Sequence, residues 1–168
     1  MWWVVFLPYA FQALLMFVDE FYFHYRRGLP RWEKIGHPLD TLTVIGCFVF
    51  LFRIPPSPVN LILYGACVVV SSLFVTKDEF VHSDHCAPGE QWVHALLFLI
   101  HPIVLVLPVA LWPALHMGEA HLPSAWVPHV PFYAFFLRGL LGFLVMYGLY
   151  QTIYWNWIWR GTVQTPKK

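Results

Sequence analysis

Charge is scarce in this sequence: only 11% of its 168 residues are Asp, Glu, Lys or Arg, against about 25% in an ordinary soluble domain. With 59% hydrophobic residues and a mean hydropathy of +0.60, the composition excludes a soluble globular domain. There is no basic stripe long enough to follow a phosphate backbone and no glycine-rich phosphate loop, which excludes nucleic-acid and nucleotide-driven functions. The cysteines number only three and form no C-x-x-C pair, which argues against a disulfide framework and a thiolate zinc site.

Long apolar stretches are what the chain does contain. They cover about 2–18, 41–54, 60–76, 95–112 and 132–158. A membrane-crossing helix uses about 20 residues, so the second stretch is too short alone and we expect its helix to begin in the polar window before it. Proline-rich links at 53–59 and 113–131 mark turns. We predict an all-α integral membrane protein with about five transmembrane helices, forming a single membrane domain over 1–168.

The basic residues predict an orientation in the membrane. With the amino terminus outside, eight of the ten Lys and Arg residues, Arg26 and Arg27 among them, fall on the cytoplasmic side. The aromatic run Tyr154–Trp159 is typical of the interface where a last span leaves the bilayer. The amino terminus lacks the basic start and the small-residue cleavage site of a secretory signal, so we expect the first span to be retained. A bacterial plasma membrane, with the carboxyl terminus in the cytoplasm, fits this pattern.

Two polar windows, 19–40 and 77–94, hold eight of the nine acidic residues and five of the nine histidines. Each window opens with Asp-Glu-Phe, continues with a histidine and a Gly/Pro break, and closes with a glutamate and a histidine. We interpret the windows as tips of two pseudo-repeated helical hairpins, repeat 1 over about 2–54 and repeat 2 over about 60–112. Together the hairpins are expected to form a four-helix bundle, with one extra helix at about 132–159.

The repeated glutamates and histidines are candidate metal ligands. Within each helix they stand three or four positions apart and therefore share a face. The predicted ligands of two metal ions are Glu20, His24, Glu33, His37, Glu79, His82, Glu90 and His94. Further candidates, as extra ligands or as partners that orient an imidazole, are Asp19, Asp40, Asp78, His85 and His101. No residue of this set is assigned a catalytic role.

Carboxylate and imidazole ligands in similar number suit iron, manganese or zinc better than calcium, magnesium or copper(I). The Glu79-x-x-His82 spacing resembles the di-iron carboxylate four-helix-bundle proteins, which include membrane-bound oxidases of the alternative-oxidase type. The His82-x-x-His85 pair is similar to the histidine clusters of membrane desaturases and hydroxylases. These resemblances imply two iron ions, an electron donor and oxygen activation at the cytoplasmic membrane boundary.

The expected function is an integral-membrane di-metal oxidoreductase, with iron as the first choice and zinc or manganese as alternatives. It would hydroxylate, desaturate or oxidise a lipid or another lipophilic small molecule. A zinc-dependent membrane lipid hydrolase is one alternative. Another is a non-enzymatic metal carrier, or a small structural subunit of a larger membrane complex in which the repeat is an ion-pair clamp. Glycines in the last span, Gly139, Gly142 and Gly148, are compatible with close helix contact inside the chain or in a homo-oligomer.

Overall fold

The structure is a computed structural model that describes residues 2–78, 86–118 and 124–163. Every regular element in these ranges is helical. The α-helices are α1 (Leu7–Val18), α2 (Tyr25–Arg27), α3 (Arg31–Arg53), α4 (Pro58–Val75), α6 (Pro88–Val106), α7 (Trp112–Met117) and α8 (Val130–Ile153). Short 3-10 turns cover Trp2–Phe6, Thr76–Asp78, Leu107–Leu111 and Val127–His129, and π-helical turns cover Asp19–His24 and Tyr154–Ile158.

These elements join into five helices that are long and apolar enough to cross a membrane. They span Trp3–Arg27, Arg31–Arg53, Pro58–Val75, Pro88–Met117 and Val127–Ile158. The prediction of an all-helical chain with five such helices is confirmed for the described residues. The second span does begin in the polar window, at Arg31, and so reaches 23 residues. The last proline-rich link is shorter than predicted, because Pro113 lies in the first turn of α7, a position that tolerates proline.

The break between the first two spans follows from its residues. Gly28 ends α2 with a φ of 74°, a left-handed conformation that side chains rarely adopt. A Cβ atom there would also lie 2.5 Å from the Trp159 ring. Pro30 then precedes the first residue of α3, where the chain is extended. The second predicted break is seen in its outgoing half, since Pro88 is the first residue of α6.

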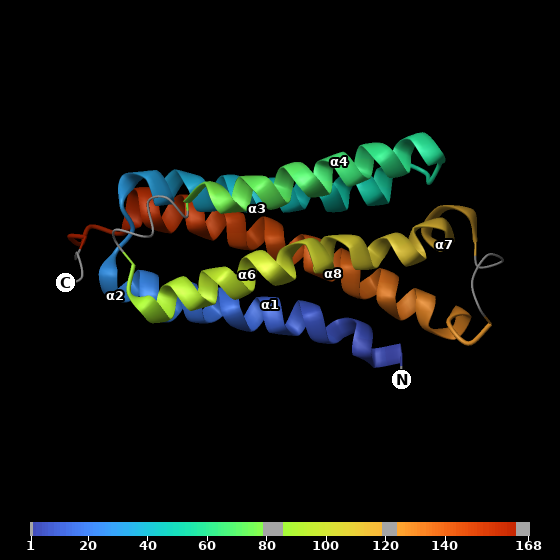
Figure 1. Ribbon diagram of the computed structural model, residues 1–168, viewed down its shortest axis with the longest axis horizontal. Coiled ribbons are helices and arrows are strands. Elements are labelled where there is room, and N and C mark those ends of the chain that lie inside the picture. Colours follow the sequence, from blue (N-terminus) through green and yellow to red (C-terminus); the bar gives the residue numbers. More distant parts are fainter. Residues whose placement is uncertain (1, 79–85, 119–123, 164–168) are drawn as a thin grey trace.

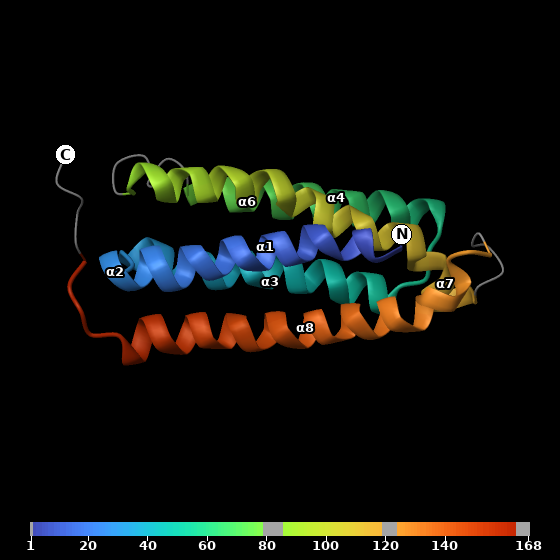
Figure 2. The same cartoon turned by 90° about the horizontal axis from the view of Figure 1, so that it is seen from below.

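The five spans run up and down along one direction (Figures 1 and 2). Neighbours around the assembly follow the order α1, α6, α4, α3 and α8. The ring closes where α8 returns to α1, with the rings of Phe6 and Phe136 4.8 Å apart. Consequently α1 packs against α6, from the other half of the chain, and α3 packs against α4 and α8. This places the starts of α3 and α6 beside the end of α1.

Apolar packing fills the middle of the assembly and the end that holds α7. Phe48, Leu51 and Leu105 are fully buried there, and the Tyr64 hydroxyl donates to the Leu105 carbonyl over 2.7 Å. Outward-facing side chains are apolar as well, as Ile62 and Phe135 show with exposed fractions of 73% and 72%. Such a surface suits hydrocarbon surroundings. Among the described residues, the buried acidic side chains all lie at the opposite end, in the Asp19–His24 turn and at the starts of α3 and α6; we call this end the site end (left in Figure 1).

Candidate metal centre

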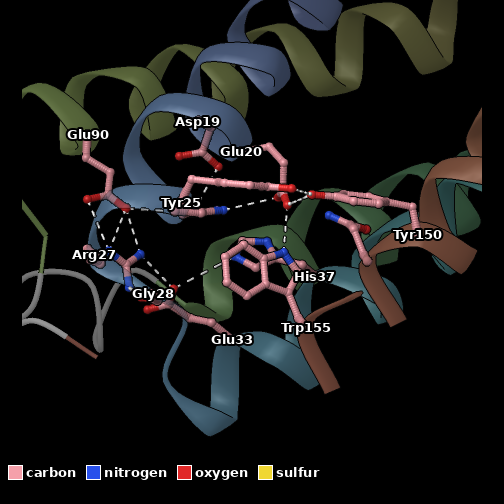
Figure 3. Close-up of polar contacts among 12 residues, drawn as sticks. Asp19, Glu20, Tyr25, Arg27, Gly28, Glu33, His37, Glu90, Tyr150 and Trp155 are labelled. Atoms are coloured by element: carbon pink, nitrogen blue, oxygen red, sulfur yellow. Dashed lines mark hydrogen bonds and ion pairs between the residues drawn. The ribbon is translucent and has the colours of Figure 1, made fainter. Parts of the chain in front are cut away.

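Ionisable side chains gather inside the site end, where they are withdrawn from the surface. We call this group the polar cluster (Figure 3). Its fully or nearly fully buried members are Asp19, Glu20, His24, Arg27, Glu33, Glu90 and His94, and the partly buried His37 adjoins them. Charged side chains at this depth are costly unless they are paired, bound to a metal or used in function. The polar cluster is therefore the leading candidate for the functional site.

A π-helical turn over Asp19–His24 forms one side of the site. It continues α1 without a break and joins it to α2. Within this single wide turn Asp19, Glu20 and His24 are all buried. In an ordinary α-helix two consecutive residues point in clearly different directions, and a wide turn brings them closer to one face. Single π-helical turns inside α-helices are frequent at functional sites.

Four buried residues from two helices converge on one point. Asp19 approaches both imidazoles: its Oδ1 lies 2.9 Å from His94 Nε2 and its Oδ2 lies 3.3 Å from His24 Nε2. Glu90 Oε1 lies 3.7 Å from the same His24 Nε2. One ligand atom of each of these four residues lies within 4.8 Å of those of the other three. Two carboxylates and two imidazoles thus form a compact set that can hold one metal ion.

Glu20 contacts His24 on the side of the ring that points away from this set. Its Oε2 lies 3.3 Å from His24 Nδ1, the ring nitrogen that points away from Asp19. Its Oε1 accepts hydrogen bonds from Trp155 Nε1 at 2.6 Å and from the Tyr150 hydroxyl at 2.9 Å (Figure 3). A carboxylate bonded to one nitrogen of a histidine fixes the tautomer and aims the other nitrogen at a metal. The geometry therefore gives Glu20 an orienting position, and Asp19 the position nearer to both imidazoles.

A smaller group adjoins the first and shares His24 with it. His24, Glu33 and His37 also offer ligand atoms within 4.8 Å of one another. The His24 and His37 rings are 4.8 Å apart, and His37 Nε2 lies 4.0 Å from Glu33 Oε2. This group lies between the end of the first span and the start of α3. Because Glu20 bonds Nδ1 of His24, only Nε2 is left to bind a metal, and His24 can serve one of the two groups at a time.

Arg27 is the residue of the site that sequence reasoning missed, since it was counted only as a cytoplasmic basic residue. Its Nη2 lies 2.6 Å from Glu90 Oε1 and 2.7 Å from Glu33 Oε2 (Figure 3). A signal for it exists in the sequence: Glu20, His24 and Arg27 stand at i, i+4 and i+7, which is one helical face. The neighbouring Arg26 is exposed and stacks on the Tyr22 ring instead.

The formal charge of the polar cluster is strongly negative. It holds four buried carboxylates, and Arg27 is the single Lys or Arg among its members. Before the imidazoles are counted, three negative charges are left uncompensated. Burying such an excess is unfavourable. The cluster therefore needs further positive charge, which either protonated histidines or a bound metal cation can supply.

Several predicted candidates lie apart from the four-residue set. Asp40 forms an ion pair with Lys77, with 2.7 Å between Oδ1 and Nζ. His101 lies deeper in the span, where its Nε2 is 3.0 Å from the Ser71 hydroxyl. Neither residue belongs to a metal-binding group found among the described residues. Glu79, His82 and His85 lie outside the described residues, as does the side chain of Asp78.

A cavity of about 110 Å³ opens beside the four-residue set, and we call it the inner cavity. Asp19, His37 and His94 line it at the site end, and His101 lines it further into the span. Gln151 also borders it and accepts a hydrogen bond from the Thr41 hydroxyl at 2.8 Å. The candidate ligands thus border a space whose walls carry several polar groups and which is large enough for a small group of a bound molecule.

Cys86 is buried next to the cluster, just before α6. Burial raises the pKa of its thiol well above the ordinary value. The Glu90 and Glu33 carboxylates act in the same direction, whereas Arg27 opposes them. A neutral thiol is a poor metal ligand and a poor nucleophile. Among the described residues, Cys86 belongs to neither group of candidate ligands.

Comparisons with known proteins assign no family to this chain. No protein-family model, no curated protein and no solved structure matches it.

Proposed function

We propose that this chain is an integral-membrane metalloprotein whose principal metal ion is held by Asp19, His24, Glu90 and His94. The observation that carries the proposal is the convergence of these four buried side chains, with ligand atoms within 4.8 Å of one another. The excess negative charge of the polar cluster supports it, because a dication there lowers the cost of burying the carboxylates. Glu20 adds support, since it holds His24 in the orientation typical of metal-bound histidines.

The proposed reaction class is oxidation of a lipid-soluble substrate, with iron as the metal. Two carboxylates and two imidazoles are the donor types that iron, manganese and zinc accept. Glu33 and His37 are the residues proposed for a second ion, which would complete a di-metal centre, and His24 stays with the first ion because Glu20 already bonds its other ring nitrogen. Iron bound in this way would supply oxygen activation for hydroxylation, desaturation or oxidation, with electrons from a separate donor. In the finer fold proposal, the two pseudo-repeated hairpins supply these ligands as a four-helix bundle, and α8 is the extra helix.

The chain's own residues have defined tasks in this proposal. Glu20 orients His24 through Nδ1, and Trp155 and Tyr150 keep the Glu20 carboxylate in place. Arg27 balances the charge of Glu90 and Glu33 while its apolar stem excludes water. The inner cavity gives the reacting part of a substrate a place beside Asp19 and His94.

The proposed orientation puts the site end in the cytoplasm of a bacterial cell and the amino terminus outside. Arg26, Arg31 and Lys34 lie at the site end, at the junction of the first two spans. Arg53 ends α3 at the opposite end, beyond the apolar core. An excess of basic residues on one side is the usual mark of the cytoplasmic face.

A structural clamp is the second candidate function, and Arg27 is the observation that favours it. The guanidinium joins α2, α3 and α6 by contacting Glu33 and Glu90. Such an ion-pair network can hold helices together without any metal, for example in a small subunit of a larger membrane complex. The two candidate functions differ in the metal content that they predict for the purified protein: the metal centre requires a bound metal ion, and the clamp requires none.

Elemental analysis of the detergent-purified full chain, with the His94→Ala and Glu90→Gln variants, tests the proposal. His116→Ala is the matched control, because His116 lies in α7 and contacts the Leu51 carbonyl at the other end of the protein. Iron that is present in the wild type and the control and lost in both ligand variants supports the oxidoreductase. Zinc that is present in the wild type and the control and lost in both ligand variants supports the zinc-dependent hydrolase instead. The absence of any stoichiometric metal in the wild type overturns the metal centre and leaves the clamp.

A further inference from the structure

A second, larger cavity lies on the flank of the protein between α1 and α8, and we call it the lateral cavity. Its volume is about 480 Å³. Its walls are almost entirely apolar, and they include Tyr9, Ala13 and Phe17 from α1 with Phe143, Met146 and Tyr150 from α8. Several of these side chains also face outward, with exposed fractions of 61% for Phe17 and 71% for Met146. In a membrane this flank faces hydrocarbon, so the lateral cavity is open to lipid.

Polar contacts join the first and the last span at two levels along the protein. At one level the Tyr9 and Tyr133 hydroxyls are 2.9 Å apart. At the other, near the site end, Glu20 accepts the hydrogen bond of Trp155. The polar contacts at both levels fix the opening between them.

The lateral cavity and the inner cavity lie side by side inside the protein and share part of their walls. Gln12, Met16 and Tyr147 line both of them. A molecule in the lateral cavity therefore lies next to the space that Asp19 and His94 line. Cavities of several hundred Å³ with apolar walls and a few polar groups at one end are typical of ligand sites.

Gln12 supplies an independent sign of a ligand at this junction. Its amide oxygen is buried, and no hydrogen-bond partner for it exists among the described residues. A buried amide oxygen without a partner is unfavourable, and a ligand group that donates a hydrogen bond to it would remove that cost. A hydroxyl group suits the position well, since it can donate and accept.

The residues that line the inner cavity limit the end group of the ligand. Among the described residues that line it, there is no Lys or Arg that could pair with a carboxylate or phosphate. A charged head group would therefore be buried without a cationic side chain as its partner, which is costly. An uncharged polar end group is favoured for this reason.

We infer that the lateral cavity is the entry and binding site for a single-chain neutral lipid, and that a long-chain alcohol is its simplest member. The apolar chain lies between α1 and α8, and the hydroxyl end bonds to Gln12 and points toward Asp19 and His94. This inference deepens the proposed function and rests on it for the chemistry, whereas the binding site itself is independent of the metal.

Photo-crosslinking tests the inference with the full chain in lipid nanodiscs and a long-chain alcohol that carries a diazirine in its chain. We expect mass spectrometry to find the label on α1 and α8 near Phe17 and Met146. The Ala13→Trp variant fills the opening and should reduce this labelling at least tenfold. Ala66→Trp is the matched control, because Ala66 is also exposed but lies on α4 and does not line the cavity. Gln12→Leu should weaken binding about three- to tenfold, the loss of one hydrogen bond.

Competition and metal content separate the possible outcomes. An unlabelled long-chain alcohol should displace the probe, and the ionised fatty acid of equal length should not. Labelling spread evenly over all lipid-facing helices, or equal displacement by the fatty acid, overturns the inference. Metal analysis of the same samples keeps the two proposals apart: localised labelling of a protein without metal refutes the metal centre alone, and a metal-loaded protein without localised labelling refutes the lipid site alone.

Discussion

Arg27 and Glu90 form the shortest ion pair of the site, with 2.6 Å between Nη2 and Oε1, although 63 positions separate them in the chain. The guanidinium Nε also donates to the same carboxylate, at 3.0 Å from Oε1. Glu90 is thus held between Arg27 on one side and His24 on the other, at 3.7 Å. This ion pair joins the end of the first span to the start of α6. Substitution of Arg27 therefore tests how the negative charge of the polar cluster is compensated.

Replacing Arg27 by Met is expected to destabilise the protein strongly. The substitution leaves Glu33 and Glu90 buried without their shared cation, and breaking a buried pair in this way costs about 3–5 kcal/mol. Thermal unfolding in detergent measures the effect. Arg26→Met is the control, since Arg26 is exposed and should change stability by less than about 0.5 kcal/mol. Equal stability of the two variants would show that Arg27 does not stabilise the site.

Metal can compensate for the loss of Arg27. A dication bound by Asp19, His24, Glu90 and His94 neutralises Glu90 in place of the guanidinium. We therefore expect added iron(II) or zinc to raise the unfolding temperature of the Arg27→Met variant more than that of the wild type. A chelator should have the opposite effect. Unfolding temperatures that do not respond to metal in either protein would favour the clamp.

The hydrogen bond from Trp155 to Glu20 gives a second prediction. Trp155→Phe keeps an aromatic ring but removes the donor at 2.6 Å, so one oxygen of Glu20 loses its strongest partner. We expect a loss of about 1–3 kcal/mol in stability and a fall of about tenfold or more in metal affinity, because Glu20 holds His24 less firmly. Trp157→Phe is the control, since Trp157 is 68% exposed. Metal titration and thermal unfolding of both variants check the expectation.

His101 and His94 lie on the same helix, and the structure predicts different effects for them. His101 bonds to Ser71, outside the four-residue set, whereas His94 contacts Asp19 directly. His101→Gln should therefore retain the metal of the wild type, and His94→Gln should lose it. Elemental analysis of the two purified variants distinguishes them. Loss of metal in His101→Gln alone would place the metal deeper in the inner cavity.

The Cys86 thiol is expected to react slowly. Burial raises its pKa, so less of it is thiolate at mildly alkaline pH than in an unfolded chain. Because the folded-state pKa is the higher one, this group stabilises the fold below the unfolded-state pKa, and that contribution is lost as the pH rises further. Peptide-resolved alkylation with iodoacetamide at increasing pH measures the reaction in the native and the denatured protein. Equal rates in the two samples at mildly alkaline pH would contradict the prediction.

Much of the fold could be predicted because it depends on local composition. Apolar length determines which segments can span a membrane, and Gly28 with Pro30 breaks the chain wherever tertiary contacts place it. The extension of α3 back to Arg31 followed from the minimum length of a span. The clustering of acids and histidines in two windows also indicated where the candidate site lies, since ionisable residues next to long apolar helices need partners.

Only the tertiary structure decided which of these side chains meet. Asp19 and Glu20 are neighbours, and helical periodicity cannot tell which one faces His94; the π-helical turn and the donors Trp155 and Tyr150, both from the last helix, decide it. Packing of α1 against α6 brings Arg27 to Glu90. Residue spacing along one helix cannot predict this contact, because the two residues belong to distant segments of the chain. The sequence by itself therefore determined the spans and the chemistry available, whereas long-range packing decided which groups become candidate ligands, which orient them and which balance their charge.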